Sequence, residues 1–279
     1  MDRDTPFQNK AKFWADESLG GLELLYADYL TQEFAPHTHD FYAIGVVQSG
    51  ALSFKPKSPS EVVPPGNIMI IHPGEVHTGR CVGDHGCKYR MFYVHPTNLR
   101  ELFQHLSGKP VESLFFRDQN IEDKETAKLL HSLHVAIESL QAPAIEKESR
   151  LILALTNLLV RHATPRPFVI QDRPNRKFVK MAKEFIEDHY HDNVTLKEIA
   201  LAVNISPFHL LRTFKEEIGL APHAYLTQYR IGKARRLLSK GTPIVQVALQ
   251  TGFCDQSQFA KRFKQLVGTT PGHYRSTPQ

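Results

Sequence analysis

Cysteine is scarce in this chain of 279 residues, which has three: Cys81, Cys87 and Cys254. Three scattered cysteines are too few for a disulfide framework or a four-thiolate zinc site. We therefore expect reduced thiols, at the neighbouring pair Cys81 and Cys87 as well. Long apolar runs are also missing, because the longest, 151–160, is about half of what a bilayer requires, and no apolar leader follows the first residues. The sequence predicts a cytoplasmic protein with no membrane partner.

The composition excludes a disordered, collagen-like or coiled-coil chain, since 41% of the residues are hydrophobic and 23% are charged. The length favours two domains. Residues 1–170 carry 17 Lys and Arg against 20 Asp and Glu, whereas residues 171–279 carry 17 against 9, a net charge of +8. The carboxy-terminal part is therefore expected to meet a polyanion, although charge alone does not choose between DNA, RNA and a membrane.

The amino-terminal part carries short β-rich runs separated by Gly and Pro turn signals. Their spacing predicts strands over residues 41–48, 51–54, 67–71 and 89–94. Strands this short and closely spaced are typical of a small antiparallel barrel or sandwich, which we place at about residues 20–95.

Leucine and isoleucine recur at helical spacing from residue 121 onward. The pattern predicts two amphipathic helices within residues 121–163, interrupted at Pro143. We expect this pair to mediate homodimerisation, and packing on its own barrel is the alternative. A Pro-rich and Arg-rich stretch over residues 164–177 predicts an exposed linker.

An internal repeat dominates the carboxy-terminal part. The pattern F-K-x3-G-x2-P-x2-Y begins at Phe214 and recurs 49 residues later at Phe263. A short helix and a tight turn are expected before each copy, followed by a second helix that runs into the copy. This order predicts helix-turn-helix units over residues 195–218 and 243–267. A continuous helix over residues 222–240 is expected to join them.

On a helical wheel, the second helix of each unit has one buried stripe and one polar face. The outward positions coincide at the 49-residue offset: Phe208, His209, Arg212 and Lys215 in the first unit, and Ser257, Gln258, Lys261 and Lys264 in the second. Arg, Lys and Gln side chains match the hydrogen-bonding groups of guanine and adenine. Two matching polar faces in a basic domain favour DNA readout over a merely solvated surface.

These paired units, ending in the sequence GFCDQSQFAKRFK and then GTTPGHYR, resemble the AraC/XylS family of transcription regulators over about residues 174–276. The resemblance implies binding to promoter DNA and contact with RNA polymerase. Carried over by position, it implies base-facing roles for Phe208, Leu211 and Arg212, and for Gln256, Ser257, Gln258 and Lys261. Leu211 departs from the polar residue usual at its place, so a thymine methyl contact and no base contact both stay open.

Histidines in the amino-terminal part resemble the two short motifs of the cupin barrel, namely Pro36-His-Thr-His39 and His72-Pro-Gly-Glu-Val-His77. Two histidines two apart on a strand share a face, so His37 and His39 are expected to converge with His77. The glutamate that catalytic cupins add after the second histidine is missing. We therefore favour binding of a small-molecule effector by His37, His39, Tyr42, Glu75 and His77 over a metal site of the three histidines or a purely structural role.

The sequence as a whole predicts an α+β fold with two domains. Residues 1–163 form a cupin-like effector-binding domain, residues 164–177 a linker, and residues 178–279 an all-α DNA-binding domain with two helix-turn-helix units. We expect a ligand-responsive transcription regulator that activates nearby metabolic or transport genes. We do not expect an enzyme or a bound cofactor. The alternatives are a cupin metalloenzyme or metal sensor fused to a DNA-binding domain, an alkyl-accepting DNA repair protein, and a nucleoid protein indifferent to ligand.

Overall fold

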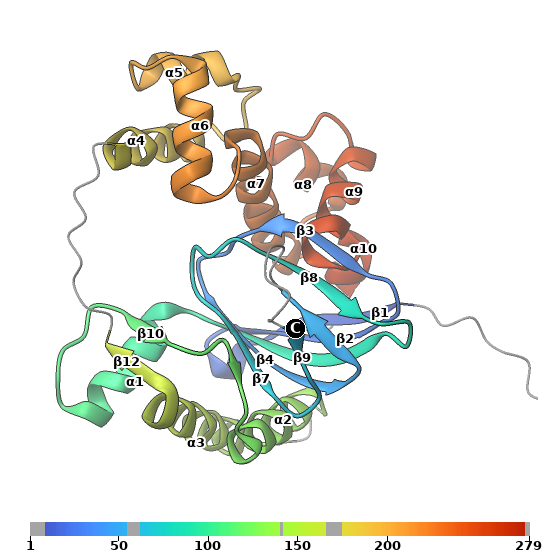
Figure 1. Cartoon of the computed structure of the whole chain (residues 1–279). Helices are drawn as coiled ribbons and strands as arrows, with labels where there is room; N and C mark the ends of the chain where they lie inside the picture. Colours follow the sequence, from blue (N-terminus) through green and yellow to red (C-terminus); the bar gives the residue numbers. More distant parts are fainter. Residues whose placement is uncertain (1–8, 55–61, 140–141, 166–174, 277–279) are drawn as a thin grey trace, which may run out of the picture. The chain divides into compact units, whose positions relative to one another are not determined.

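The computed structural model of the chain describes residues 9–54, 62–139, 142–165 and 175–276 (Figure 1). It divides into two compact units. The first comprises residues 1–33 and 39–167, and the second comprises residues 168–278 together with the segment Phe34–Thr38. Most of the predicted linker, from residue 166 to residue 174, lies outside the described residues.

The first unit is rich in strands, as the sequence predicts. A six-stranded antiparallel sheet has the order β1-β2-β9-β4-β7-β11, a four-stranded sheet has the order β3-β8-β5-β6, and β10 pairs with β12. The described strands thus form separate sheets and not one closed barrel. Their bounds are β1 Lys10–Asp16, β2 Leu22–Tyr29, β3 Glu33–His37, β4 Tyr42–Ser49, β5 Ala51–Ser53, β6 Val62–Val63, β7 Ile68–Ile71, β8 His77–Val82, β9 Cys87–Val94, β10 Leu114–Phe116, β11 Asn120–Ile121 and β12 Ala163–Pro165.

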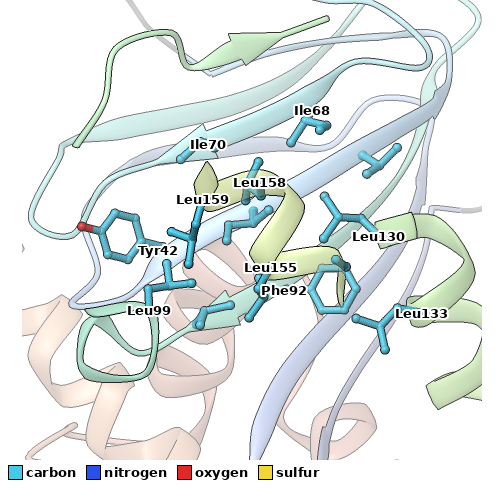
Figure 2. Packing of buried hydrophobic residues seen from close by; sticks show 14 of the residues in the cluster. Tyr42, Ile68, Ile70, Phe92, Leu99, Leu130, Leu133, Leu155, Leu158 and Leu159 are labelled. Atoms are coloured by element: carbon cyan, nitrogen blue, oxygen red, sulfur yellow. The ribbon is translucent and has the colours of Figure 1, made fainter. Parts of the chain in front are cut away.

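Alternate residues of the large sheet face a layer of helices. The register pairs Leu24 and Ile44 with Phe92, and these side chains enter one core with leucines of the helices (Figure 2). The helices are α1 Pro96–Ser107, α2 Lys124–Glu138 and α3 Ala144–His162. The sequence predicts α2 and α3 but not α1, in which Leu99 is the only fully buried side chain among described residues.

Two polar contacts lie under this helical layer. Arg90 of β9 places Nη1 2.9 Å from Nδ1 of His134 and 2.6 Å from a carboxylate oxygen of Glu138. Lys147 of α3 donates a hydrogen bond of 2.7 Å to the buried carboxylate of Asp16 on β1. Both contacts fix a helix to the sheet, since a buried charge is tolerated only when it is paired.

The expectation of reduced thiols at Cys81 and Cys87 is wrong. The two residues form a disulfide, with their Cα atoms 5.4 Å apart, and Cys254 is free and exposed. Cys81 lies near the end of β8 and Cys87 at the start of β9, so the turn between these strands brings the two side chains together. The sequence shows only that the two cysteines are six residues apart. Whether they can bond depends on the geometry of the turn between β8 and β9.

Apart from the β3 residues 34–37, the described elements of the second unit are all helices. Its helices are α4 Asn175–Asp188, α5 Leu196–Ala202, α6 Pro207–Ile218, α7 Pro222–Ser239, α8 Ile244–Gln250, α9 Gln256–Val267 and α10 Pro271–Ser276. Helices α5 and α6 form the first helix-turn-helix, α8 and α9 form the second, and α7 joins them. Helix α4 is absent from the sequence prediction, and it packs with α5 and α6 around Val179, Ala182 and Ile186.

The two helix-turn-helix units repeat each other in their backbone signals. Ser206 and Asp255 cap α6 and α9 as predicted, each accepting a hydrogen bond from the backbone N–H three residues on. The turn before each cap has a residue of left-handed conformation, Asn204 (φ 55°) and Gly252 (φ 76°). The repeat in sequence is therefore a repeat in conformation.

No helix within the described ranges is both long and apolar enough to cross a membrane.

Candidate nucleic-acid interface and effector site

Helix α6 separates a buried face from an exposed face, as its wheel predicts. Leu210 and Phe214 are fully buried, whereas Phe208 is 75% exposed and Leu211 38% exposed. Arg212 and Lys215 are exposed as well, and His209 is half-buried. The exposed face therefore combines two cationic side chains with two apolar ones, which is suited to phosphate contacts and thymine methyl contacts.

Helix α9 presents the corresponding face of the second unit. Phe259 and Phe263 are fully buried on one side. The other side exposes all five predicted residues: Gln256, Ser257, Gln258, Lys261 and Lys264. Arg262 is also exposed, and the wheel does not assign it to this face. Its Nη1 donates a hydrogen bond of 3.2 Å to Gln265, which holds it along the helix surface.

Arg212 remains accessible to DNA although it forms an ion pair. The guanidinium of Arg212 lies 3.7 Å from the carboxylate of Glu216 one turn on, and both side chains are 60% exposed. An exposed pair of this kind contributes little free energy, so phosphate or base contacts displace it at small cost.

Arg230, a cationic residue of α7, has a structural role. Arg230 donates hydrogen bonds from Nε to the carbonyl of Tyr190 (2.6 Å) and from Nη2 to the carbonyl of Asp192 (2.8 Å). It thereby holds the loop after α4 against α7, because two backbone carbonyls need a donor there. Arg236 and Lys240 are exposed, as expected for phosphate contacts or a solvated surface.

In the first unit the structure brings two of the predicted effector residues together. The rings of His39 and His77 meet edge-on with centroids 4.7 Å apart. His39 stacks on Phe41 at 4.6 Å, and Phe41 meets Tyr93 at 5.2 Å. His77 is 4% exposed, and its Nδ1 lies 3.0 Å from the carbonyl oxygen of Glu75. Imidazoles and aromatic rings thus form one cluster.

The side chains of Tyr42 and Glu75 contact residues that do not belong to that cluster. The hydroxyl of Tyr42 donates a hydrogen bond of 2.8 Å to the carbonyl of Leu114 within the helix-covered core. A carboxylate oxygen of Glu75 accepts from the Gln119 side chain and lies 3.3 Å from Nδ1 of His72. Strand alternation points Tyr42 to the face that the helices cover, and the Glu75 carboxylate contacts Gln119 and His72.

His37 is the terminal residue of β3, and His39 follows the strand. The expectation that both lie on one strand is therefore wrong. The Nδ1 of His37 lies 2.8 Å from the carbonyl oxygen of Ala35, and His37 groups with the second unit. Among the residues that the structure describes, no three His, Cys, Asp or Glu side chains are arranged to hold a metal ion. The predicted three-histidine metal set thus has no support.

Three tyrosines share the face of the cluster, and two of them, Tyr29 and Tyr89, are not among the candidate residues of the sequence. Tyr89 and Tyr93 alternate along β9, and Tyr29 meets Tyr89 edge-on with centroids 6.0 Å apart. Burial, together with the charges of Tyr29 and Tyr93, raises the pKa of Tyr89 well above its usual value. Burial likewise raises the pKa of Tyr29. The phenols therefore stay neutral hydrogen-bonding groups at physiological pH. In the sequence, Tyr89, Met91 and Tyr93 occupy every second position of one strand, which indicates that they share a face.

Family models match both parts of the chain. An AraC-like ligand-binding domain matches residues 19–155, and a helix-turn-helix domain matches residues 199–277. Together they cover most of the strand-rich unit with its helices and most of the first helix-turn-helix unit, and all of the second.

Two curated relatives cover most of the chain. An uncharacterized HTH-type transcriptional regulator of Bacillus subtilis, YbfI, is 32% identical over 228 residues, which is 82% of each chain. The HTH-type transcriptional activator RhaS of Escherichia coli O81 is 25% identical over 87% of this chain and 88% of its own. The crystal structure of ToxT from Vibrio cholerae O395 has the same fold, with a TM-score of 0.56 at 12% identity and 97% coverage of both chains. The chain belongs to the AraC family of helix-turn-helix transcription regulators.

Proposed function

We propose that this regulator is an activator whose two recognition helices, α6 and α9, read promoter DNA under the control of a small molecule bound in the strand-rich unit. One observation carries the proposal. The two helices expose matching basic and polar faces at a 49-residue offset, and each helix buries two large apolar side chains on its opposite face. Because the same exposed face occurs on both helices, we infer that both faces have the same function. In a unit with a net positive charge, that function is contact with DNA.

The roles of the residues follow from their chemistry. Arg212 and Lys261 occupy corresponding places on α6 and α9, and each is suited to guanine. Gln258 is suited to adenine, and Phe208 and Leu211 to thymine methyl groups. The remaining members of the two faces contact phosphates or flanking bases: His209, Lys215, Gln256, Ser257 and Lys264. RNA polymerase is the expected second partner of the DNA-bound chain.

The effector is proposed to bind at the cluster of His39 and His77. Neutral imidazoles and phenols donate and accept hydrogen bonds, while Phe41 and Tyr93 supply the apolar walls that such sites have. His37, the last residue of β3, remains a candidate effector-binding residue. An effector controls DNA binding only if it binds one state of the chain better than another.

Homodimerisation is proposed to use α3. Its outward side exposes four apolar side chains, namely Ile145 (71%), Ile152 (55%), Leu153 (50%) and Val160 (67%). They lie on one side of the helix, opposite the residues that enter the core. A second copy of this helix offers the same apolar surface, as a two-fold interface requires.

A regulator of this kind carries out no chemical reaction, and it acts in the cytoplasm, where the promoter DNA is. An enzymatic alternative predicts turnover with a bound metal. Metal analysis of the purified chain tests it, since a stoichiometric metal would contradict the proposal.

The decisive experiment is selection of bound fragments from genomic DNA by the full chain, followed by affinity measurements on the selected site. Arg212→Ala and Lys261→Ala are each expected to weaken binding by about 1–3 kcal/mol and to relax selectivity at one position. Lys180→Ala is the matched control, because Lys180 is also an exposed cation but lies on α4, outside both recognition helices. Unchanged binding and selectivity in both variants would overturn the assigned reading faces.

A further inference from the structure

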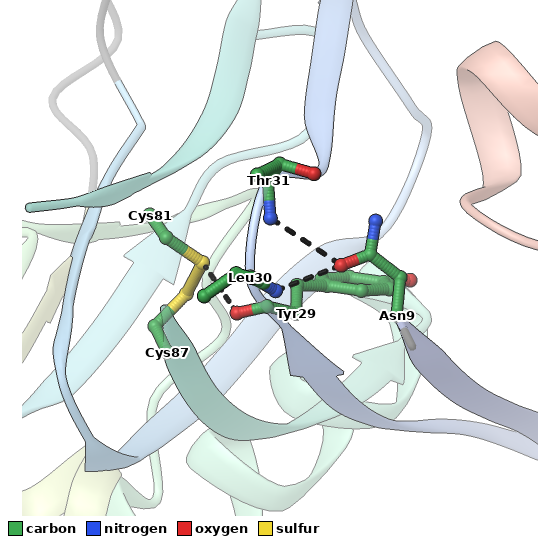
Figure 3. Close-up of a disulfide and its surroundings, with 6 residues drawn as sticks. All are labelled: Asn9, Tyr29, Leu30, Thr31, Cys81 and Cys87. Atoms are coloured by element: carbon green, nitrogen blue, oxygen red, sulfur yellow. Dashed lines mark hydrogen bonds between the residues drawn. A yellow bond between two sulfur atoms is a disulfide. The ribbon is translucent and has the colours of Figure 1, made fainter. Parts of the chain in front are cut away.

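The disulfide between Cys81 and Cys87 joins two strands that belong to different sheets (Figure 3). Strand β8 lies in the four-stranded sheet and β9 in the six-stranded sheet. The bond spans only six residues of sequence. A cross-link that closes so short a loop restricts the unfolded chain less than one that closes a long loop. Its effect is therefore local, on the corner where the sheets meet.

Of the two bonded residues, Cys81 gives an attacking thiolate the better access. Cys87 is 2% exposed, whereas Cys81 is half-buried beside an exposed turn, residues 82–85. Gly83 and Gly86 adopt left-handed conformations in this turn. Thiol–disulfide exchange requires such access to a sulfur, which a bond buried in a core does not offer.

The two bonded strands lead from the disulfide to the proposed effector cluster. His77 and Cys81 lie four residues apart on β8 and therefore share a face. Cys87, Tyr89 and Tyr93 alternate on β9 and share a face as well. Tyr93 lies 6.2 Å from His39 between ring centroids, and His39 packs on His77. The disulfide thus joins the end of β8 to the start of β9, and each of these strands carries a cluster residue further along, His77 and Tyr93.

The packing around the disulfide is tight. Cys87 pairs in register with Tyr29 of β2, and a side chain at Gly86 would lie 2.3 Å from the carbonyl oxygen of Tyr29. The Sγ atom of Cys81 lies 3.3 Å from the same carbonyl oxygen. A sulfur in a disulfide has no proton, whereas the thiol of a reduced Cys81 donates a weak hydrogen bond at this distance. Reduction therefore changes the contacts of Tyr29, whose ring packs on Tyr89.

We infer that Cys81 and Cys87 form a reversible thiol–disulfide switch that sets the affinity of the effector site. This inference rests on the proposed effector site at His39 and His77. The oxidised pair holds β8 and β9 in the arrangement described here, and the reduced pair frees the corner beside Tyr29 and Tyr89.

The exchange takes its electrons from a low-molecular-weight thiol or a protein dithiol. A thiolate attacks Sγ of Cys81, the Cys81–Cys87 bond breaks, and Cys87 leaves as a thiolate that takes up a proton. A second thiolate then attacks the mixed disulfide, which releases Cys81 as a thiol and an external disulfide. The chain gains two electrons and two protons, and two external thiols are oxidised.

The first test measures the redox equilibrium on the full chain. The protein is equilibrated in glutathione buffers of graded ratio, alkylated and weighed by mass spectrometry. We expect Cys81 and Cys87 to convert together as one two-electron couple within the buffered range. Cys254→Ser is the matched control, because Cys254 is free and exposed in the other unit and its loss leaves the couple unchanged. A pair that stays oxidised in excess dithiol while the chain remains folded, or one that never oxidises, would overturn the switch.

The second test asks whether the redox state reaches the cluster. Ring signals of Tyr89, Tyr93, His39 and His77 are compared by NMR in the oxidised and reduced chains, and we expect them to shift. Ring signals of His209 and Tyr274, in the other unit, serve as the internal control. Reduction without a shift at the cluster would contradict the coupling. Neither readout needs DNA or an effector, so failure of the proposed function would be seen separately, as absence of selected DNA or ligands.

A double variant, Cys81→Ser with Cys87→Ser, mimics the reduced state and should reproduce its ring signals. If this variant does not fold, chemical reduction of the unaltered chain gives the same comparison.

Discussion

The rings of Phe214 and Tyr225 meet edge-on with their centroids 5.6 Å apart, and Phe263 and Tyr274 repeat this contact at 5.4 Å. In both copies the phenylalanine is fully buried on the recognition helix, and the tyrosine lies on the helix that follows. The contact fixes the buried side of each recognition helix, so the opposite side is presented to DNA in a defined orientation.

The buried and exposed phenylalanines of α6 are expected to respond in opposite ways to the same substitution. Phe214→Ala leaves a cavity and should lower the free energy of unfolding of the second unit by about 3–5 kcal/mol. Phe208 is 75% exposed, so Phe208→Ala should leave that free energy nearly unchanged and weaken DNA binding. Hydrogen exchange of the α6 amides measures the first effect, and titration of the selected site measures the second. Equal loss of stability in both variants would show that Phe208 packs in solution.

The two turn residues of left-handed conformation are expected to differ in tolerance. A Cβ at Gly252 would lie 2.7 Å from the carbonyl oxygen of His191, and the φ of 76° is strained for any other residue. Gly252→Ala should therefore lower the free energy of unfolding by about 1–3 kcal/mol. Asn204→Gly, at the matching turn, relieves such strain and should change it by less than about 1 kcal/mol. Denaturant unfolding compares the two, and a harmless Gly252→Ala would contradict the packing against His191.

His134 should make the first unit sensitive to acid. Burial, and then the charge of Arg90, lowers the pKa of His134 to about 3. The unfolded chain binds a proton here near pH 6.5, and the folded chain does not until about pH 3, so stability falls as the pH falls through this window. The expected slope is about 1.4 kcal/mol per pH unit. His134→Gln removes the titrating group, and urea unfolding at a series of pH values should show a shallower acid slope. An identical slope would refute the assignment.

Charge on the outward side of α3 should prevent dimerisation. Leu153→Asp places a carboxylate within the exposed apolar surface and is expected to convert the dimer to a monomer, because an unpaired charge is costly to bury. Leu106→Asp is the matched control, since Leu106 is 44% exposed on α1 and Leu153 is 50% exposed. Sedimentation velocity distinguishes the two species. A dimer that survives Leu153→Asp, or a chain that is monomeric from the start, would contradict this use of α3.

The sequence pattern was a good guide wherever the determining interactions are local. Helix caps at Ser206 and Asp255, the buried stripe with Phe214 and Phe263, and the outward residues of α6 and α9 all follow from neighbours within one or two turns. The resemblance of the carboxy-terminal part to the AraC family is confirmed by the family match over residues 199–277. Helix α4 escaped notice because its apolar residues follow a Pro-rich and Arg-rich stretch without a marked cap.

The amino-terminal site was harder to predict because its members meet across strands. His39 and His77 do come together, but Tyr42 faces the helices and Glu75 holds a loop, which depends on the register of β4 and on the path of the loop after β7. Tyr29 and Tyr89 join the same face through a pairing between β2 and β9. A one-residue change of register would move each of these side chains to the opposite face.

Periodicity and a local repeat are enough to predict a strand-rich unit, an amphipathic helix pair and two helix-turn-helix units with basic outward faces. The folded chain was needed to show which aromatic and imidazole side chains share a face and that Cys81 is bonded to Cys87. These outcomes depend on strand pairing and turn geometry, which join residues far apart in the chain or set a distance that spacing alone does not give.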